Sequence, residues 1–336
     1  MQQPLVSILI PFKNTAPFLN ECIESVIQQT YTNWQVLAVN DHSEDRSLQL
    51  VSDMAKKDDR ILVLENRGKG IISALQTAYQ QSSGELITRM DSDDVMVKTK
   101  LEFLVTSLLK NGKGHIAVGQ VKYFSHRGIS NGYERYEQWL NHLTSKGSNY
   151  TEIYKECVIP SPCWMTYRDD LNACQAFEPD RYPEDYDLTF RFYQNGLSCI
   201  PCDTVLHHWR DYDTRTSRTS EHYAQNYFLN IKLFYFLKID RKPNRVLTVW
   251  GAGKKGKEIA RGLKKSGIDF FWLCDNPKKI GKKIYGIKMH HFSLLKELTL
   301  PQSIITVANE ESQTVIRDYL TRLGYLPMKD FFFFCK

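Results

Sequence analysis

The sequence lacks a long hydrophobic run. Nowhere in its 336 residues do apolar side chains approach the roughly 20 that a bilayer-spanning helix needs. The opening residues, MQQPLVSILIPFKN, have no basic segment ahead of their apolar run, so we expect a strand there and not a secretion signal. In such a chain the eight cysteines are expected to be reduced thiols. These absences predict a cytoplasmic protein and leave contact with the inner face of the cell membrane open.

A strong charge of one sign is also missing. The 44 basic and 38 acidic residues give a net charge of +6, which is too small an excess to predict a partner among nucleic acids. With 12 prolines, 18 glycines and 42% hydrophobic residues, the composition excludes collagen-like and largely disordered chains. The length predicts about two domains.

Strand and helix patterns alternate through the first ninety residues. Apolar, β-rich runs at 5–11, 34–39, 61–64 and 85–90 are separated by helical patterns at 17–29, 47–57 and 71–81. This alternation predicts an α/β fold with a doubly wound sheet. Right-handed crossovers would place the loops 40–45, 66–70 and 91–94 at the carboxyl ends of the strands, where such sheets bind ligands.

A second α/β pattern starts at Arg245, after a charged segment at 238–245 that we interpret as a linker. We therefore predict one domain over residues 1–240 and a smaller one over 241–336. The aromatic-rich helix expected over 223–237 would pack in a core, or else lie on a membrane surface with Lys232 and Lys238 outward. The run Phe331–Phe334 suits a final buried strand.

The sequence Asp91-Ser92-Asp93 follows the fourth predicted strand. Two carboxylates at a ligand-binding edge repel each other unless a cation lies between them. Oxygen ligands of this kind suit Mg²⁺ or Mn²⁺, which commonly share their coordination shell with substrate phosphates. The alternative is an acidic turn that caps the next helix.

Three segments occur in a characteristic order: PLVSILIPFKNTAPFLNECIESVIQQTYTNWQVLAVNDHSEDRS, then GKGIISALQTAYQQSSGELITRMDSDD, then YPEDYDLTFRF. Together they resemble the family 2 glycosyltransferases of the GT-A fold, over roughly residues 4–220. The resemblance implies a mixed sheet and a metal-dependent, inverting transferase. Such an enzyme moves a sugar from a nucleotide-sugar donor to a hydroxyl of a glycan or lipid-linked acceptor, in surface polysaccharide synthesis.

The same resemblance implies roles for individual residues around the donor. Asp41 would contact the base of the nucleotide, while Pro11 and Asn14 would shape the floor beneath it. Arg89 would balance charge on the diphosphate. The metal ion, Mn²⁺ or Mg²⁺, would be held by Asp91 and Asp93.

Asp185, with Glu184 beside it, would be the general base that deprotonates the acceptor hydroxyl. A single base opposite the leaving group predicts inversion, since retention would need a second, nucleophilic carboxylate, and the sequence offers no clear candidate. The alternative is that both acids only provide favourable charge at a helix N-terminus.

The segment LHHWRDYDTRTSR is the third candidate part of this site. His208 or His207 would complete the metal shell. Arg210, Arg215 and Arg218 would close over the diphosphate, because arginine binds phosphate bidentately. The alternative is a hydrogen-bonded histidine followed by a solvated basic loop.

One loop departs from the usual pattern of the family, and one pair of cysteines is weak evidence for a metal or redox site. The loop after the second strand reads NDHSED where NDGSTD is usual, so His42 replaces a glycine and would be strained at positive φ. Cys199 and Cys202 have CxxC spacing, but without a second pair we do not expect a zinc or redox site.

In the predicted second domain, the sequence GAGKKG follows a strand and precedes a helix. Gly251, Gly253 and Gly256, with Asp275 at the end of the next strand, fit a dinucleotide-binding fingerprint. The segment resembles the Rossmann-like domain appended to some glycosyltransferases. It would bind a nucleotide, modify sugar nucleotides, dock a partner or lipid carrier, or merely use its glycines for packing.

Overall fold

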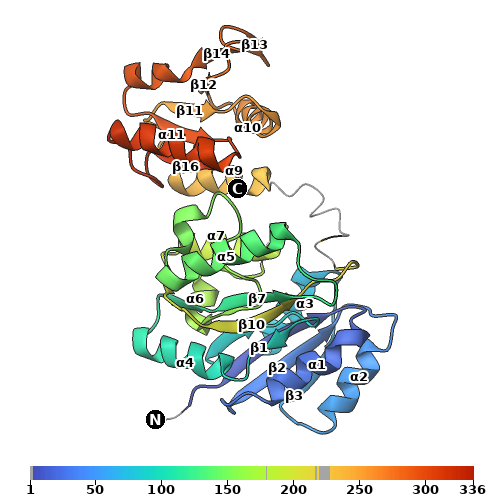
Figure 1. Cartoon of the computed structure of the whole chain (residues 1–336). Coiled ribbons are helices and arrows are strands. Elements are labelled where there is room, and N and C mark those ends of the chain that lie inside the picture. The colour runs from blue at the N-terminus through green and yellow to red at the C-terminus, as the bar shows by residue number, and fades with distance from the viewer. Residues whose placement is uncertain (1–2, 179, 216–217, 219–227) are drawn as a thin grey trace. The chain divides into compact units, whose positions relative to one another are not determined.

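The computed structural model describes residues 3–178, 180–215, 218 and 228–336. The chain forms two compact units (Figure 1). The first contains residues 1–150 and 158–223, and the second contains 151–157 and 224–336. In this division, residues 228–240, which precede the predicted boundary, group with the second unit.

The first unit is built on a seven-stranded mixed sheet in the order β3-β2-β1-β4-β8-β6-β9. The strands β1 to β4 are parallel, and β8 pairs antiparallel with both β4 and β6. The bounds of these strands are β1 Val6–Phe12, β2 Trp34–Asn40, β3 Ile61–Glu65, β4 Leu86–Arg89, β6 His115–Val118, β8 Trp164–Tyr167 and β9 Ser198–Ile200. The four parallel strands and the α/β fold class are thus confirmed.

Helices cover this sheet because their apolar side chains recur with helical spacing. In α1, for example, Leu19, Cys22, Ile23 and Val26 share one buried face. The helices of the unit are α1 Ala16–Ile27, α2 Ser47–Ala55, α3 Ile71–Gln81, α4 Lys100–Asn111, α5 Asn131–Lys146, α6 Arg168–Ala173 and α7 Glu184–Gln194.

A three-stranded sheet has the order β5-β10-β7. Its strand β5 directly follows residues 91–94, which we call the aspartate loop. The sheet consists of β5 Val95–Met96, β7 Gln120–Phe124 and β10 Val205–Arg210. Gly119 separates β7 from β6, which belongs to the larger sheet. A Cβ on Gly119 would lie 2.7 Å from both Cys163 Sγ and Leu206 Cδ1, so this close passage requires glycine.

The second unit holds another largely parallel sheet, in the order β13-β14-β12-β11-β15-β16. The second, smaller α/β domain is confirmed. From β11 the chain continues to β12 on one side of the sheet, and from β15 it continues to β16 on the other side, so the strand order reverses between β11 and β15. The elements of this unit are α9 Leu229–Tyr235, β11 Leu247–Trp250, α10 Lys254–Lys265, β12 Phe271–Cys274, β13 Lys283–Ile284, β14 Ile287–His291, β15 Gln302–Ile305, α11 Glu310–Arg322 and β16 Phe331–Phe333.

Aromatic side chains form the core where α9 meets the last strand of this unit. Tyr154 stacks on Phe334 at 5.1 Å and meets Phe332 edge-on, and Phe236 contacts the same pair. Lys232 is buried in this region, with Nζ donating to the carbonyls of Lys155 and Phe334. The helix expected over 223–237 therefore packs inward at Lys232 and does not present it to a membrane surface; residues 223–227 lie outside the described part.

Candidate functional site

Arg89, at the end of β4, joins two of the motifs that the sequence predicted separately. Its Nε donates to Asp91 Oδ1 at 2.9 Å, and its Nη1 donates to Glu184 Oε1, also at 2.9 Å. Arg89 and Glu184 are buried. The structure therefore brings the Asp91-Ser92-Asp93 loop and the start of α7 to one place at the carboxyl ends of the strands.

The carboxylates of the aspartate loop differ in their surroundings. Burial would raise the pKa of Asp91, but the charges of Arg89 and Arg215 outweigh burial and lower this pKa below its usual range. Burial and the neighbouring Asp94 raise the pKa of Asp93 to about 7. Tyr212 donates its hydroxyl to Asp93 Oδ2 at 2.8 Å, and Ser161 donates to Asp91 Oδ2 at 3.2 Å.

Asp94 anchors a buried chain of three side chains behind this loop. Lys100 Nζ lies 3.1 Å from His207 Nδ1, and His207 Nε2 lies 2.9 Å from Asp94 Oδ2. Burial and the charge of Lys100 lower the pKa of His207 well below its usual value, and burial raises the pKa of Asp94 to about 8. Asp94 Oδ1 also accepts from the backbone N–H of Arg210 at 2.8 Å.

His207, and not His208, is therefore the histidine that meets the aspartate loop. His208 is half-buried and places its ring edge-on to Phe124 at 6.2 Å. Metal binding by His208 together with Asp91 and Asp93 stays a prediction. Strand alternation could have suggested that only one of the pair points inward, but not which one.

The three arginines predicted to bind the diphosphate lie in different settings. Arg210 Nε donates to the carbonyl of Asp93 at 2.7 Å, and its guanidinium pairs with Glu21, so it belongs to the site. Arg218 is exposed and pairs with Asp211 at 2.8 Å. Arg215 is buried and acts electrostatically on Asp91, Asp93 and Asp94.

The Asp185 carboxyl caps the first turn of α7 through a bond from the backbone N–H of Tyr186 at 2.8 Å. Burial and the charge of Glu184 raise the pKa of Asp185 to about 7. Glu184 is ion-paired with Arg89. The Asp185 carboxyl, in contrast, has a pKa near neutrality, and such a carboxylate is suited to general base chemistry.

Asp41, buried at the end of β2, organises the loop that follows β3. Its Oδ1 accepts from Asn66 Nδ2 at 2.6 Å and from the backbone N–H of Gly70 at 3.0 Å. Gly70 has φ +86°, and a Cβ there would lie 2.9 Å from Tyr182 Oη. The loop after β3, which Asp41 holds, and the segment before Asp185 therefore approach each other closely.

The two residues predicted for the nucleotide floor lie next to this loop. Pro11 pairs with Val39 across β1 and β2, and Asn14, with φ +53°, accepts from the backbone N–H of Glu44 through Oδ1. His42 has φ +56°, the left-handed conformation anticipated for the usual glycine, and its Nε2 lies 2.7 Å from the carbonyl of Gly68. This bond ties the loop after β2 to the loop after β3.

A divalent cation fits the donor set of the aspartate loop. Among the described residues no three histidine, cysteine, aspartate or glutamate side chains are grouped as a metal cage. Two carboxylates are nevertheless sufficient where substrate phosphates supply further oxygens. The raised pKa of Asp93 reflects negative charge crowded into a buried space, which a cation between Asp91 and Asp93 would relieve.

The family model described as "Glycosyl transferase family 2" matches residues 7–174. The chain belongs to this family. The match ends within the first unit, and it includes Asp41, Arg89, Asp91 and Asp93.

Curated glycosyltransferases are similar to the chain over the first unit. UDP-Glc:alpha-D-GlcNAc-diphosphoundecaprenol beta-1,3-glucosyltransferase WfgD of Escherichia coli is 29% identical over 212 residues, which are 62% of this chain and 78% of that protein. The uncharacterized glycosyltransferase EpsJ of Bacillus subtilis (strain 168) is 35% identical over 215 residues, which are 62% of this chain and 61% of EpsJ.

Solved structures share the fold of this glycosyltransferase. S. aureus TarS 1-349 in complex with UDP-GlcNAc is 18% identical, with a TM-score of 0.54, and the alignment covers 70% of this chain and 68% of that one. The mannosyltransferase PcManGT from Pyrobaculum calidifontis, in complex with GDP-Man and Mn2+, is 17% identical with a TM-score of 0.52, covering 70% and 64%. The first unit is thus a GT-A-like glycosyltransferase domain, as the sequence predicted.

The second unit of the glycosyltransferase carries the glycine motif at the end of β11. A Cβ on Gly256 would lie 2.1 Å from the carbonyl oxygen of Gly251, and one on Gly251 would lie 2.3 Å from Thr306 Oγ1. These two glycines therefore allow α10 to pack closely against the sheet. Gly253 is exposed before α10, and Asp275 is exposed after β12. Nucleotide binding by this loop remains a prediction.

Two further features of the glycosyltransferase bear on the sequence predictions. Cys199 and Cys202 are both buried, and all eight thiols are free. In the described part of the chain, no helix is long and apolar enough to cross a membrane.

Proposed function

We propose that the first unit transfers a sugar from a nucleoside-diphosphate donor to a hydroxyl of a glycan or lipid-linked saccharide, with inversion at the anomeric carbon. Support comes above all from the contact of Arg89 with both Asp91 and Glu184, because a single site would then contain the proposed diphosphate side and the proposed acceptor side of the reaction. Membership of glycosyl transferase family 2 supports the reaction class.

Asp185 is the proposed general base. Its carboxylate takes the proton of the acceptor hydroxyl while the acceptor oxygen forms a bond to the anomeric carbon. The bond from that carbon to the diphosphate oxygen breaks in the same step, and the nucleoside diphosphate leaves with the electron pair. A single carboxylate on the acceptor side gives inversion, whereas retention would need a nucleophilic carboxylate next to the sugar.

Arg89 and Arg210 hold the diphosphate side of the site. Asp91 and Asp93 would hold a divalent ion, which when bound neutralises charge on the departing diphosphate. Arg89 keeps Asp91 ionised and offers a further positive charge within the same buried space. Asp41 and the loop that it fixes through Gly70 form the proposed nucleotide-binding side.

For the substrates, the name of the E. coli relative supports a UDP-sugar donor and an acceptor linked through diphosphate to a polyprenol. We therefore propose a lipid-linked saccharide as the acceptor, in the synthesis of a surface polysaccharide. UDP-glucose and UDP-N-acetylglucosamine are the first donors to test, with GDP-mannose as the third.

The test compares the wild-type chain with Asp185→Asn and a matched control, Asp59→Asn, which alters an exposed aspartate. Donor binding is followed by calorimetry with Mn²⁺, and transfer by product chromatography. We expect Asp185→Asn to abolish transfer while its donor Kd stays within about threefold, and NMR of the wild-type product should show the inverted anomer. Loss of donor binding in Asp185→Asn, or a retained anomer, would overturn the proposed roles.

A further inference from the structure

The positive charge of the chain is concentrated in its last 96 residues. Residues 241–336 contain 19 basic and 8 acidic residues, a net charge of +11, whereas the whole chain has +6. The remaining 240 residues therefore carry a net charge of −5. The modest total conceals a strongly basic second unit joined to an acidic first one.

Most of this charge lies in one stretch, residues 254–288, with 11 basic and 3 acidic residues. It contains α10 and the β13–β14 hairpin. The stretch has eight exposed cations: Lys254, Arg261, Lys264, Lys265, Lys278, Lys282, Lys283 and Lys288. By contrast, α11 carries three acidic and two basic residues. The basic character thus belongs to one side of the unit, since α10 and α11 cross over in opposite directions from the centre of the sheet.

Contacts between α10 and the segment 278–288 make this a continuous surface. Lys264 Nζ donates to the carbonyl of Tyr285 at 2.8 Å, and the Arg261 guanidinium lies 5.7 Å from the centre of the Tyr285 ring. Nearer the start of α10, Lys279 Nζ donates to the carbonyl of Ala252 at 2.8 Å. We call α10 together with residues 278–288 the basic face.

Among the described residues, the eight exposed cations of the basic face form no ion pair. The ion pairs formed among the described residues of the second unit are Lys155–Glu152, Arg245–Asp330 and Arg317–Glu152. None of them includes one of the eight exposed cations of the basic face. Concentrated like charge of this kind is unfavourable by itself, and an anionic surface would compensate it.

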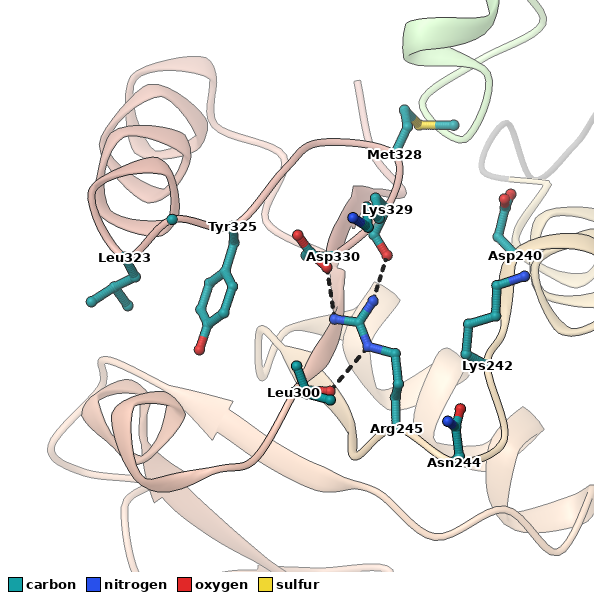
Figure 2. A pocket seen from close by; sticks show the side chains of 11 residues that line it. Asp240, Lys242, Asn244, Arg245, Leu300, Leu323, Tyr325, Met328, Lys329 and Asp330 are labelled. Carbon is teal, nitrogen blue, oxygen red and sulfur yellow. Dashed lines mark hydrogen bonds and ion pairs between the residues drawn. The ribbon is translucent and has the colours of Figure 1, made fainter.

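A hollow of the second unit lies outside the basic face. It has a volume of about 610 Å³ and is lined by Asp240, Arg245, Tyr325 and Asp330 among others. Figure 2 shows that the Arg245 guanidinium in it is already bonded to Asp330 and to backbone carbonyls. Arg245 therefore links the chain segments at the amino ends of β11, β15 and β16, and its hydrogen bonds are made within the fold.

We infer that the basic face docks on the surface of an anionic lipid bilayer. Seven of its eight exposed cations are lysines. A lysine ammonium is a compact charge that is attracted by many lipid headgroups at once, whereas bidentate binding of nucleic-acid phosphates favours arginine. At the tip of the hairpin, the partly exposed Ile284, Tyr285 and Ile287 stand between Lys283 and Lys288. An aromatic and aliphatic tip flanked by lysines matches the boundary between headgroups and acyl chains.

This inference goes beyond the proposed transferase reaction and does not rest on it, since binding to vesicles needs no donor, metal or acceptor. The test is co-sedimentation of the full chain with vesicles of phosphatidylcholine alone and with 30% phosphatidylglycerol. We expect binding only to the anionic vesicles, with a loss of more than tenfold between 50 and 300 mM salt, because screening weakens attraction between exposed charges.

The diagnostic variant carries Lys265→Glu, Lys278→Glu, Lys282→Glu and Lys283→Glu, all at exposed positions. Its matched control carries Lys57→Glu, Lys98→Glu, Lys110→Glu and Lys146→Glu, exposed lysines of the first unit. The partition coefficient should fall at least about a hundredfold in the first variant and less than fivefold in the control. Should the first variant unfold, the same four positions changed to Gln should lower binding at least tenfold.

Three results would overturn the inference: equal binding to neutral vesicles, equal losses in the two variants, or no vesicle binding by the wild type. A fluorescent 20-nucleotide RNA serves as the competing anion. If the wild type bound RNA but not vesicles, and the basic-face variant lost RNA binding, the surface would be assigned to nucleic acid instead.

Discussion

Arg89 and Glu184 are 95 positions apart in sequence, yet their side chains form a buried ion pair at 2.9 Å. Arg89 also pairs with Asp91, so a single guanidinium neutralises one acid from each of two motifs. Buried carboxylates that share a cation in this way depend on it, since removing one partner leaves an uncompensated charge in a site with little access to water.

We therefore expect Arg89→Met to destabilise the chain by about 3–5 kcal/mol, because Asp91 and Glu184 lose their common partner. Arg89→Lys should lie between Met and wild type, since one ammonium cannot reproduce the bidentate geometry. Urea unfolding of the first unit measures the effect. In Arg89→Met/Glu184→Gln, part of the loss should be recovered; a change below 1 kcal/mol in Arg89→Met would show that the bridge is not a structural determinant.

Asp185→Asn should stabilise the fold while it abolishes transfer. Burial and Glu184 raise the native pKa of Asp185 to about 7, above its value in the unfolded chain. Ionisation of Asp185 therefore lowers the free energy of unfolding. The advantage of the Asn variant should be absent near pH 4, grow as pH rises, and reach its full size above pH 7. Thermal unfolding at pH 4, 6 and 8 measures this, with Asp59→Asn as control; a constant Tm difference across this range would contradict the raised pKa.

The pH profile of transfer should follow the same carboxyl group. A general base must be ionised to accept the acceptor proton, so kcat/KM should fall about tenfold per pH unit below about pH 7. Profiles measured at saturating Mn²⁺ and donor separate this titration from changes in donor binding. A flat profile between pH 5.5 and 7 would assign the base to another group.

Local patterns were sufficient to predict β1 to β4 and the loops at their ends, because apolar periodicity and turn residues lie close together in sequence. His42 could also be anticipated, since a residue in place of a turn glycine must adopt positive φ. The Lys100–His207–Asp94 chain could not be, because its members meet only through the packing of α4 and β10 on the aspartate loop. A buried lysine such as Lys232 is likewise indistinguishable in sequence from a solvated one.

Tyr212 should act on metal affinity through Asp93. Its hydroxyl donates to Asp93 Oδ2 at 2.8 Å and fixes the orientation of that carboxylate. Groups that orient a ligand in this way typically contribute tenfold or more to metal affinity. We expect Tyr212→Phe to weaken Mn²⁺ binding about tenfold, measured by electron paramagnetic resonance, with Tyr133→Phe as control. Unchanged affinity would mean that Asp93 is oriented without this hydroxyl.

His42 gives the last prediction, because it combines an unfavourable backbone conformation with a favourable bond. At φ +56° a glycine would relieve strain, but it would also remove the bond of Nε2 to the Gly68 carbonyl. These effects are each of the order of 1 kcal/mol, so His42→Gly should leave the free energy of unfolding nearly unchanged.

His42→Ala keeps the strain and loses the bond, so it should destabilise by about 1–2 kcal/mol. Both variants should raise the donor KM severalfold with little effect on kcat, since the loop that Asp41 organises through Gly70 loses its tie to the loop after β2. Steady-state kinetics with a fixed acceptor separates the two constants. If His42→Gly lowered kcat and left KM unchanged, His42 would act in the chemical step and not in positioning the nucleotide loop.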